Sequence, residues 1–109
     1  MKVSSPFGSQ TRTRLLLALE LLGQSYPREL ARFLGVSLSS VQKGLAGLDR
    51  DALVASRLIG RTRLYQLNPR YFAAKQFGAF LARLAAVDRD LKARIAALRR
   101  RPRRVGKPL

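Results

Sequence analysis

The sequence contains no cysteine and no histidine, and only six of its 109 residues are acidic. Without cysteine the chain cannot form a disulfide framework, which is compatible with a reducing cytosol. Without either residue it also lacks the ligands that soft metal ions prefer and the usual pairing of a nucleophile with a general base. The acidic residues are scattered along the chain, at Glu20, Glu29, Asp49, Asp51, Asp88 and Asp90. These absences predict a protein that is not an enzyme and has no metal site and no cofactor.

Long apolar runs are missing as well. Residues 1–8 contain no apolar core of signal-peptide length, and the leucine-rich block at residues 15–22 is too short to span a bilayer. A chain this short forms one domain at most, and its 47% apolar residues supply a modest core that oligomerisation would help to stabilise. The sequence therefore predicts a soluble, cytoplasmic protein with no membrane partner.

Positive charge is what the chain has in excess. It contains 22 Lys and Arg residues and has a formal net charge of +16 at pH 7. Such a balance attracts polyanions, and nucleic acid is the first candidate. Residues 99–109 carry many of these basic residues and no acid, and their proline and glycine content predicts a disordered tail. This tail is either a solubilising end or a clamp on the DNA backbone that adds affinity without sequence choice.

Residues 25–50 have the pattern of two helices joined by a tight turn. Ser25 can cap a first helix that begins at Tyr26 and Pro27, and Gly35 can end it through a positive φ. Ser37 or Ser39 can cap a second helix over residues 39–50. The apolar stripes that would face the core comprise Leu30, Ala31, Phe33 and Leu34 in the first helix and Val41, Leu45 and Leu48 in the second. The segment therefore predicts a helix-turn-helix.

The side of the second helix opposite its apolar stripe carries short, polar or basic side chains. Such a face is typical of a helix inserted N-terminus first into a major groove. We expect base-edge and adjacent phosphate contacts from Gln42 and Lys43, with Ser39 and Ser40, glutamine pairing best with adenine and lysine with guanine.

Two glycines lie inside this second helix, although each costs roughly 1 kcal/mol relative to alanine. Gly44 and Gly47 permit either close packing against the first helix of the pair or a close approach to the DNA backbone. The sequence leaves both explanations open.

The hydrophobic period changes after residue 52. Residues 53–58 and 62–67 are two short alternating runs rich in β-forming residues, joined around residues 59–61, where Gly60 can turn the chain. They predict a β-hairpin, the wing, with Arg57, Arg61 and Arg63 at or near its tip. These arginines are either solvated surface or, directly after a helix-turn-helix, contacts to the phosphate backbone or minor groove. Arg28, near the start of the first helix, is a further candidate for a phosphate contact.

The stretch from Gly35 to Val54, GVSLSSVQKGLAGLDRDALV, resembles the turn, recognition helix and first wing strand of ArsR-like and MarR-like winged-helix transcriptional regulators. The resemblance covers roughly residues 10–98 and implies a winged helix-turn-helix. Two departures are visible. Metal-sensing ArsR members bind their effector through Cys and His, which are missing here, and Asp51-Ala52 stands where the family pattern has Ala-Gly. Soft-metal sensing is therefore not expected.

A helix is also expected on each side of the winged helix-turn-helix. The first, at residues 11–22, has Arg12 and Arg14 at its exposed start, either in contact with phosphate or as solvated surface. After Asn68-Pro69, one long helix is expected over residues 71–100, with apolar residues spaced by three and four as in a coiled-coil seam. Its expected dimer interface comprises Phe77, Phe80, Leu84, Val87, Leu91, Ile95 and Leu98. The alternative is that this helix folds back onto residues 15–22 and completes a monomeric core.

The fold class that emerges is mainly α with a small β-hairpin, a winged helix-turn-helix followed by a long C-terminal dimerisation helix. The expected units are an N-terminal arm (1–10), the DNA-binding domain (11–68), the dimerisation helix (69–98) and the basic tail (99–109). The predicted function is a sequence-specific regulator that binds double-stranded DNA as a homodimer at a palindromic operator. The alternative is a winged-helix adaptor for protein–protein or RNA-associated interactions, since fold does not fix function.

Whether the protein senses a small molecule is not decided by its sequence. Aromatic residues just after the wing, Tyr71, Phe72, Phe77 and Phe80, either line an apolar effector cleft or belong to the core.

Overall fold

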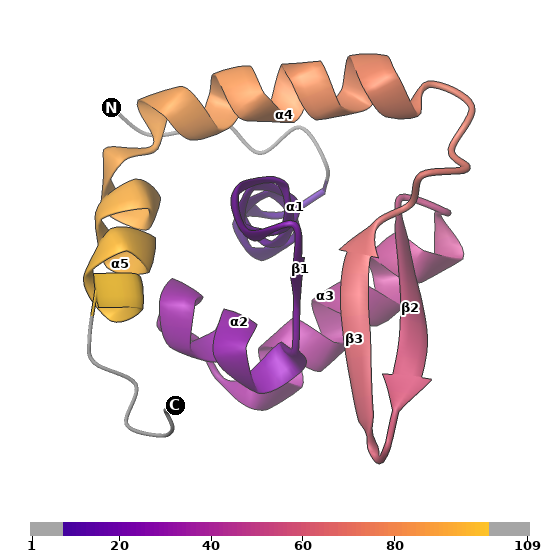
Figure 1. Ribbon diagram of the computed structural model, residues 1–109, viewed down its shortest axis with the longest axis horizontal. Coiled ribbons are helices and arrows are strands. Elements are labelled where there is room, and N and C mark those ends of the chain that lie inside the picture. The colour runs from indigo at the N-terminus through magenta and orange to yellow at the C-terminus, as the bar shows by residue number, and fades with distance from the viewer. Residues whose placement is uncertain (1–7, 101–109) are drawn as a thin grey trace.

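The computed structural model describes residues 8–100, and Figure 1 shows their arrangement. Helix α1 (Gln10–Leu22) lies at the centre, and the remaining helices and the sheet surround it. The other elements, in chain order, are β1 (Gln24–Ser25), α2 (Pro27–Leu34), α3 (Leu38–Arg50), β2 (Val54–Ile59), β3 (Thr62–Leu67), α4 (Ala74–Val87) and α5 (Arg89–Arg100). The predicted fold class, mainly helical with a winged helix-turn-helix, is confirmed. Of the predicted N-terminal arm and basic tail, residues 1–7 and 101–109 lie outside the described part of the chain.

The helix-turn-helix forms where its local signals predicted it. Pro27 is the first residue of α2, and Gly35 ends that helix in the left-handed region, with φ of 68°. Ser37 caps α3, because its Oγ accepts a hydrogen bond from the backbone N–H of Ser40 at 3.1 Å. The predicted cap of α2 is wrong: Ser25 lies in β1, and its Oγ donates a hydrogen bond to Glu29 Oε1 at 2.6 Å.

The wing belongs to a three-stranded antiparallel sheet with strand order β1-β3-β2. Strands β2 and β3 form the predicted hairpin, and β1, which the sequence did not predict, pairs with β3 through Gln24 opposite Gln66. Two residues, Gly60 and Arg61, connect the hairpin, since Ile59 pairs with Thr62. Gly60 has a φ of 63° and is the first turn residue, where a two-residue hairpin of type II′ requires glycine.

The core is built around the leucines of α1. Leu15, Leu16 and Leu17 are fully buried, and side chains from α2, α3 and the C-terminal helices pack around them. A Cβ added at Gly44 would lie 2.6 Å from Leu15 Cδ1, so glycine permits the close approach of α3 to α1. Close packing therefore accounts for Gly44, but the helix in contact is α1 rather than the first helix of the helix-turn-helix.

The prediction of one long C-terminal helix is wrong. Helix α4 ends at Val87, Asp88 is its C-cap, and α5 begins at Arg89 and folds back beside α2. Asp88 favours this corner because its Oδ1 accepts the N–H of Leu91, which caps α5, and its Oδ2 lies 3.3 Å from Arg14 Nε of α1. Helix α4 packs on α1, as the alternative of a folded-back helix predicted.

This folding back divides the residues of the predicted dimer seam. Leu91 and Ile95 are buried in the chain's own core, so the structure corrects their assignment to an interface with a second chain. Phe80 and Val87 remain 46% and 42% exposed on α4. The other three seam residues, Phe77, Leu84 and Leu98, are partly buried against the core. The surface of the seam that a second copy could reach is therefore the outer side of α4.

Candidate nucleic-acid interface

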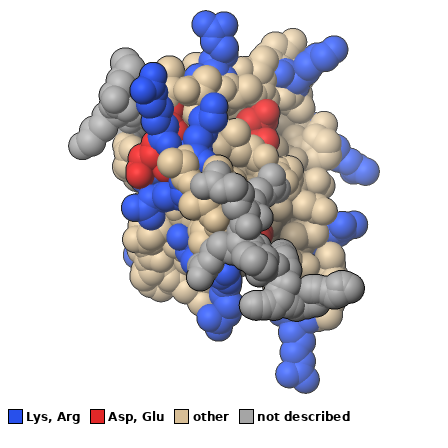
Figure 2. All heavy atoms as spheres, turned by 60° about the vertical axis from the view of Figure 1, so that its left-hand side comes forward, with Lys and Arg blue, Asp and Glu red and all other residues tan. Residues whose placement is uncertain are grey.

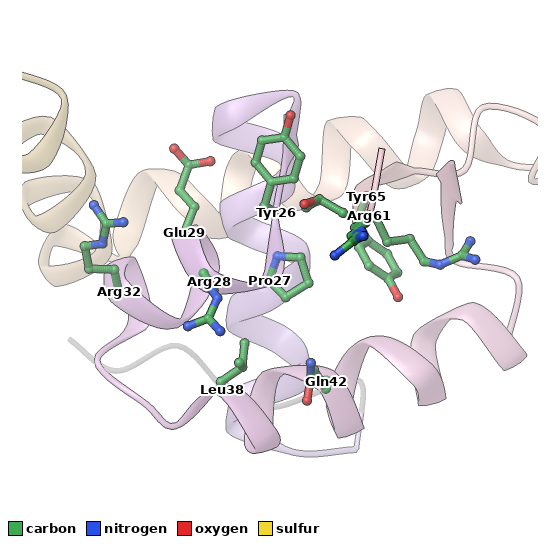
Figure 3. Close-up of a pocket in the computed structure, with 11 residues that line it drawn as sticks. Tyr26, Pro27, Arg28, Glu29, Arg32, Leu38, Gln42, Arg61 and Tyr65 are labelled. Atoms are coloured by element: carbon green, nitrogen blue, oxygen red, sulfur yellow. The ribbon is translucent and has the colours of Figure 1, made fainter. Parts of the chain in front are cut away.

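A groove with a volume of about 810 Å³ opens between α2, the start of α3 and the tip of the wing (Figure 3). It brings together residues that are more than 30 positions apart in sequence, notably Arg28 and Arg63. Its complete lining is Tyr26, Pro27, Arg28, Glu29, Arg32, Leu38, Gln42, Arg61, Thr62, Arg63 and Tyr65. Four of the predicted contact residues, Arg28, Gln42, Arg61 and Arg63, therefore share one surface.

Helix α2 contributes two arginines to this groove. Arg28 and Arg32 are four residues apart, so they lie on the same side of the helix. Both are exposed, and both also line a second, shallower hollow of about 360 Å³ with Ala31, Val36 and Leu38. Arg32 was not among the predicted contacts, although its spacing from Arg28 was a signal that could have identified it.

The register of the wing separates its three arginines. Leu58 pairs with Arg63, and the next rung pairs Arg57 with Leu64. Since successive rungs of a hairpin point to opposite faces, Arg57 and Arg63 lie on opposite sides of the wing. Arg63 lines the groove and donates a hydrogen bond to Ser56 Oγ at 3.0 Å, and Arg61 reaches the groove from the turn. Arg57 is exposed but does not line the groove, so the three arginines do not form one cluster.

The start of α3 holds a cluster of hydroxyl groups. Ser37 Oγ donates to Ser40 Oγ at 2.9 Å and lies 3.3 Å from Ser39 Oγ. Ser39 and Ser40, two of the predicted DNA contacts, are exposed. Their hydroxyl groups already have a partner, Ser37, within the cap. Gln42 is exposed and lines the groove, whereas Lys43 is exposed outside it.

The charge of the groove is strongly positive, because four arginines line it and Glu29 is its one acidic residue. The carboxylate of Glu29 already accepts the hydrogen bond from Ser25. Basic side chains also project from other parts of the surface, as Figure 2 shows for the side that includes α5. Net charge therefore attracts a polyanion to the whole molecule, and the shape of the groove determines where its backbone can lie.

The arginines of α1 have structural partners instead. Arg12 forms an ion pair with Asp51. Arg14 pairs with Asp88 and with Asp90, whose Oδ2 lies 3.1 Å from Arg14 Nη2. This hydrogen bond from Arg14 lowers the pKa of Asp90, and Arg94 adds to the effect. These contacts tie α1 to the end of α3 and to the corner between α4 and α5.

The aromatic residues after the wing pack mainly on one another. The ring of Tyr71 lies 4.9 Å from that of Phe72 and 5.6 Å from that of Phe77, measured between centroids. Phe77 is partly buried against the core, whereas Phe72 is 91% exposed. Neither of the two hollows described above is lined by these rings.

None of the helices within residues 8–100 combines the length and apolar character needed to cross a membrane.

Comparison with known proteins adds evidence on the fold. No protein-family model matches the sequence, and no curated protein has a sequence that matches it significantly. Solved structures do match. The adhesin competence repressor AdcR of Streptococcus pyogenes superposes with a TM-score of 0.60 at 19% identity, over 84% of this chain and 66% of AdcR. The chain has the winged-helix fold of MarR-family regulators.

Two further structures support this similarity. A variant of Lactococcus lactis ZitR in complex with DNA has a TM-score of 0.57 at 18% identity, over 91% of this chain and 76% of ZitR. The transcriptional regulator Tm0710 of Thermotoga maritima has a TM-score of 0.55 at 15% identity, over 83% of this chain and 70% of Tm0710. The predicted resemblance to MarR-like regulators is thus confirmed for the fold, and the chain spans about two thirds of the length of AdcR.

Proposed function

We propose that this protein is a transcriptional regulator that binds double-stranded DNA at a specific operator. The observation that carries the proposal is the groove lined by Arg28 and Arg32 of α2, Gln42 of α3, and Arg61 and Arg63 of the wing. A groove lined by cations on both sides suits a phosphodiester backbone, and an exposed amide beside it suits a base edge. The structure of a ZitR variant with a similar fold in complex with DNA supports DNA as the ligand.

The proposed mechanism separates positioning from recognition. Helix α3 enters the major groove with its N-terminus, where the helix dipole favours phosphate, and the exposed acids Asp49 and Asp51 stay at its far end. Arg28 and Arg32 bind the backbone on one side of α3, and Arg61 and Arg63 bind it on the other. Gln42 and Lys43 contact bases, while Ser39 and Ser40 support the helix start and reach an adjacent phosphate. Arg57 contacts the phosphate backbone or the minor groove from the other face of the wing.

We also propose that two copies act together. A twofold dimer would present two α3 helices to half-sites about one helical turn apart on a palindromic operator. Phe80 and Val87 are seven residues apart, and both are partly exposed on α4. The alanines at positions 79, 82 and 86 are also exposed on this helix, alongside the polar residues Lys75, Gln76 and Arg83, so apolar residues make up most of its outer side. This side of α4 is the proposed interface.

Selection of bound duplexes from a random pool tests the proposal. We expect an enriched sequence with twofold symmetry, bound more tightly than random duplex of the same length. If no sequence is enriched, and the protein instead prefers single-stranded RNA or a protein partner, the regulator assignment is wrong. That result would favour the winged-helix adaptor.

A further inference from the structure

We infer that α3 reads an A·T base pair through two residues together, Gln42 and Ala46. This inference rests on the proposed function and specifies which duplexes the protein prefers. Gln42 would accept and donate hydrogen bonds at the N6 and N7 edge of adenine. The methyl group of Ala46 would contact the thymine C5-methyl of the same or the adjacent pair.

The hydroxyl groups at the start of α3 contribute little to this choice. Ser37 Oγ accepts the N–H of Ser40 and hydrogen-bonds the hydroxyl of Ser40, and Ser39 Oγ lies within 3.3 Å of the same atom. A serine already held in such a cluster would have to break it in order to bind a base edge. Side chains further along the helix therefore determine which base pair is preferred.

Gln42 and Ala46 are the pair best placed for this role. They are four residues apart, so they lie on the same side of α3, about 6 Å apart along its axis. Both are exposed, whereas Val41 and Leu45 beside them are fully buried. Gln42 lines the groove with Arg28 and Arg61, so its amide lies beside the proposed phosphate contacts, and no hydrogen bond within residues 8–100 occupies that amide.

Ala46 supplies the second half of the preference. A methyl group gains contact with the thymine C5-methyl, and it can neither donate to nor accept from a G·C pair. A cytosine N4 amino group held against it would lose its water without gaining a partner, which disfavours that base pair. Lys43 is one position further round the helix from Gln42 and outside the groove, so a guanine contact by Lys43 would fall at a different base pair.

The test uses the duplex enriched from the random pool, with each position changed in turn to the other three base pairs. At one position of each half-site, wild type should prefer A·T on the order of tenfold, the discrimination expected of a bidentate contact. Gln42→Ala should abolish the preference for adenine there, and Gln24→Ala, which changes an exposed glutamine of β1 outside the groove, should not. Circular dichroism and thermal unfolding establish that each variant is folded.

Deoxyuridine probes Ala46 without altering the protein, because it lacks only the thymine methyl. Replacing that thymine should weaken binding to wild type severalfold and leave binding to Ala46→Gly unchanged. If wild type binds duplex with strong salt dependence but shows a G·C preference at this position, or ignores deoxyuridine, the A·T inference is wrong while the proposed function stands. If wild type shows no preference for duplex at all, the proposed function fails as well.

Discussion

Arg14 Nε of α1 lies 3.3 Å from Asp88 Oδ2, at the corner where α4 ends and α5 begins. Asp88 is only 7% exposed, and its other oxygen accepts the N–H of Leu91 as the cap of α5. One carboxylate thus caps the start of α5 and ties the corner to the central helix. The corner directs α5 back onto α2 and covers Leu91 and Ile95 with the chain's own core.

Asp88→Ala should therefore destabilise the fold by about 1–3 kcal/mol, because it removes a helix cap and leaves the largely buried Arg14 with one partner fewer. Asp88→Asn keeps a capping oxygen and should recover part of the loss. Urea unfolding of both variants and wild type measures the difference. Equal stability of Asp88→Ala and wild type would show that this residue does not maintain the corner.

The stability of the protein should fall in acid partly because of Asp90. Arg14 and Arg94 lower the pKa of this carboxyl below its ordinary value of 3.8. A lowered folded-state pKa stabilises the fold above the unfolded-state pKa, and this contribution is lost as the pH falls through the folded-state value. Unfolding free energy measured between pH 6 and pH 2 should therefore decline less in Asp90→Asn than in wild type. If the unfolding free energies of Asp90→Asn and wild type fall in parallel with pH, Asp90 does not contribute to the loss of stability in acid.

Two glycines should respond to alanine in opposite directions. A Cβ at Gly44 would lie 2.6 Å from Leu15 Cδ1, and Leu15 is fully buried, so overpacking of about 1–3 kcal/mol should exceed the helical gain of about 1 kcal/mol. At Gly78 of α4 the nearest atom would be Glu20 Oε1 at 3.6 Å, an ordinary contact. Gly78→Ala should therefore raise the melting temperature, and Gly44→Ala should lower it.

The role of the outer side of α4 in self-association can be distinguished from the role of the core in folding by introducing one charge at a time. Val87→Glu places a carboxylate on a side chain that is 42% exposed, so the chain should fold but self-associate less. Leu91→Glu buries the same charge in the core and should unfold the chain. Light scattering across a concentration series measures the mass of each variant. A Val87→Glu variant that dimerises like wild type would exclude this interface.

The sequence predicted those parts of the fold whose signals are local. Pro27, Gly35 and Gly60 each mark a helix start, a helix end or a turn through their own backbone preferences, and all three act as predicted. The break at Asp88 was missed because the apolar spacing of three and four residues continues across it. Asp88 does offer a local N-cap for α5, but its contact with Arg14 comes from a distant helix. Strand β1 was missed for a similar reason, since two residues form a strand only by pairing with β3.

The interface was predictable in its residue types more than in its arrangement. The basic wing and Gln42 follow from the pattern of a winged helix, and four of the predicted residues do meet in the groove. The separation of Arg57 from Arg63 depends on a two-residue turn, which fixes Leu58 opposite Arg63. A turn spread over residues 59–61 does not specify that register. Arg32 was missed although it lies four residues after Arg28, on the same side of α2.

The central claim is that the groove between α2, α3 and the wing binds the DNA backbone. The salt dependence of duplex binding tests it most directly. For wild type, the logarithm of the binding constant should fall linearly with the logarithm of salt concentration, with a slope of about −0.9 for each phosphate neutralised. Arg61→Ala and Arg32→Ala should each weaken binding to all duplexes and reduce the slope by about one unit. Lys92→Ala removes an exposed lysine of α5 outside the groove and should leave the slope unchanged. Equal slopes in wild type, both groove variants and Lys92→Ala would contradict the proposal that the groove binds DNA.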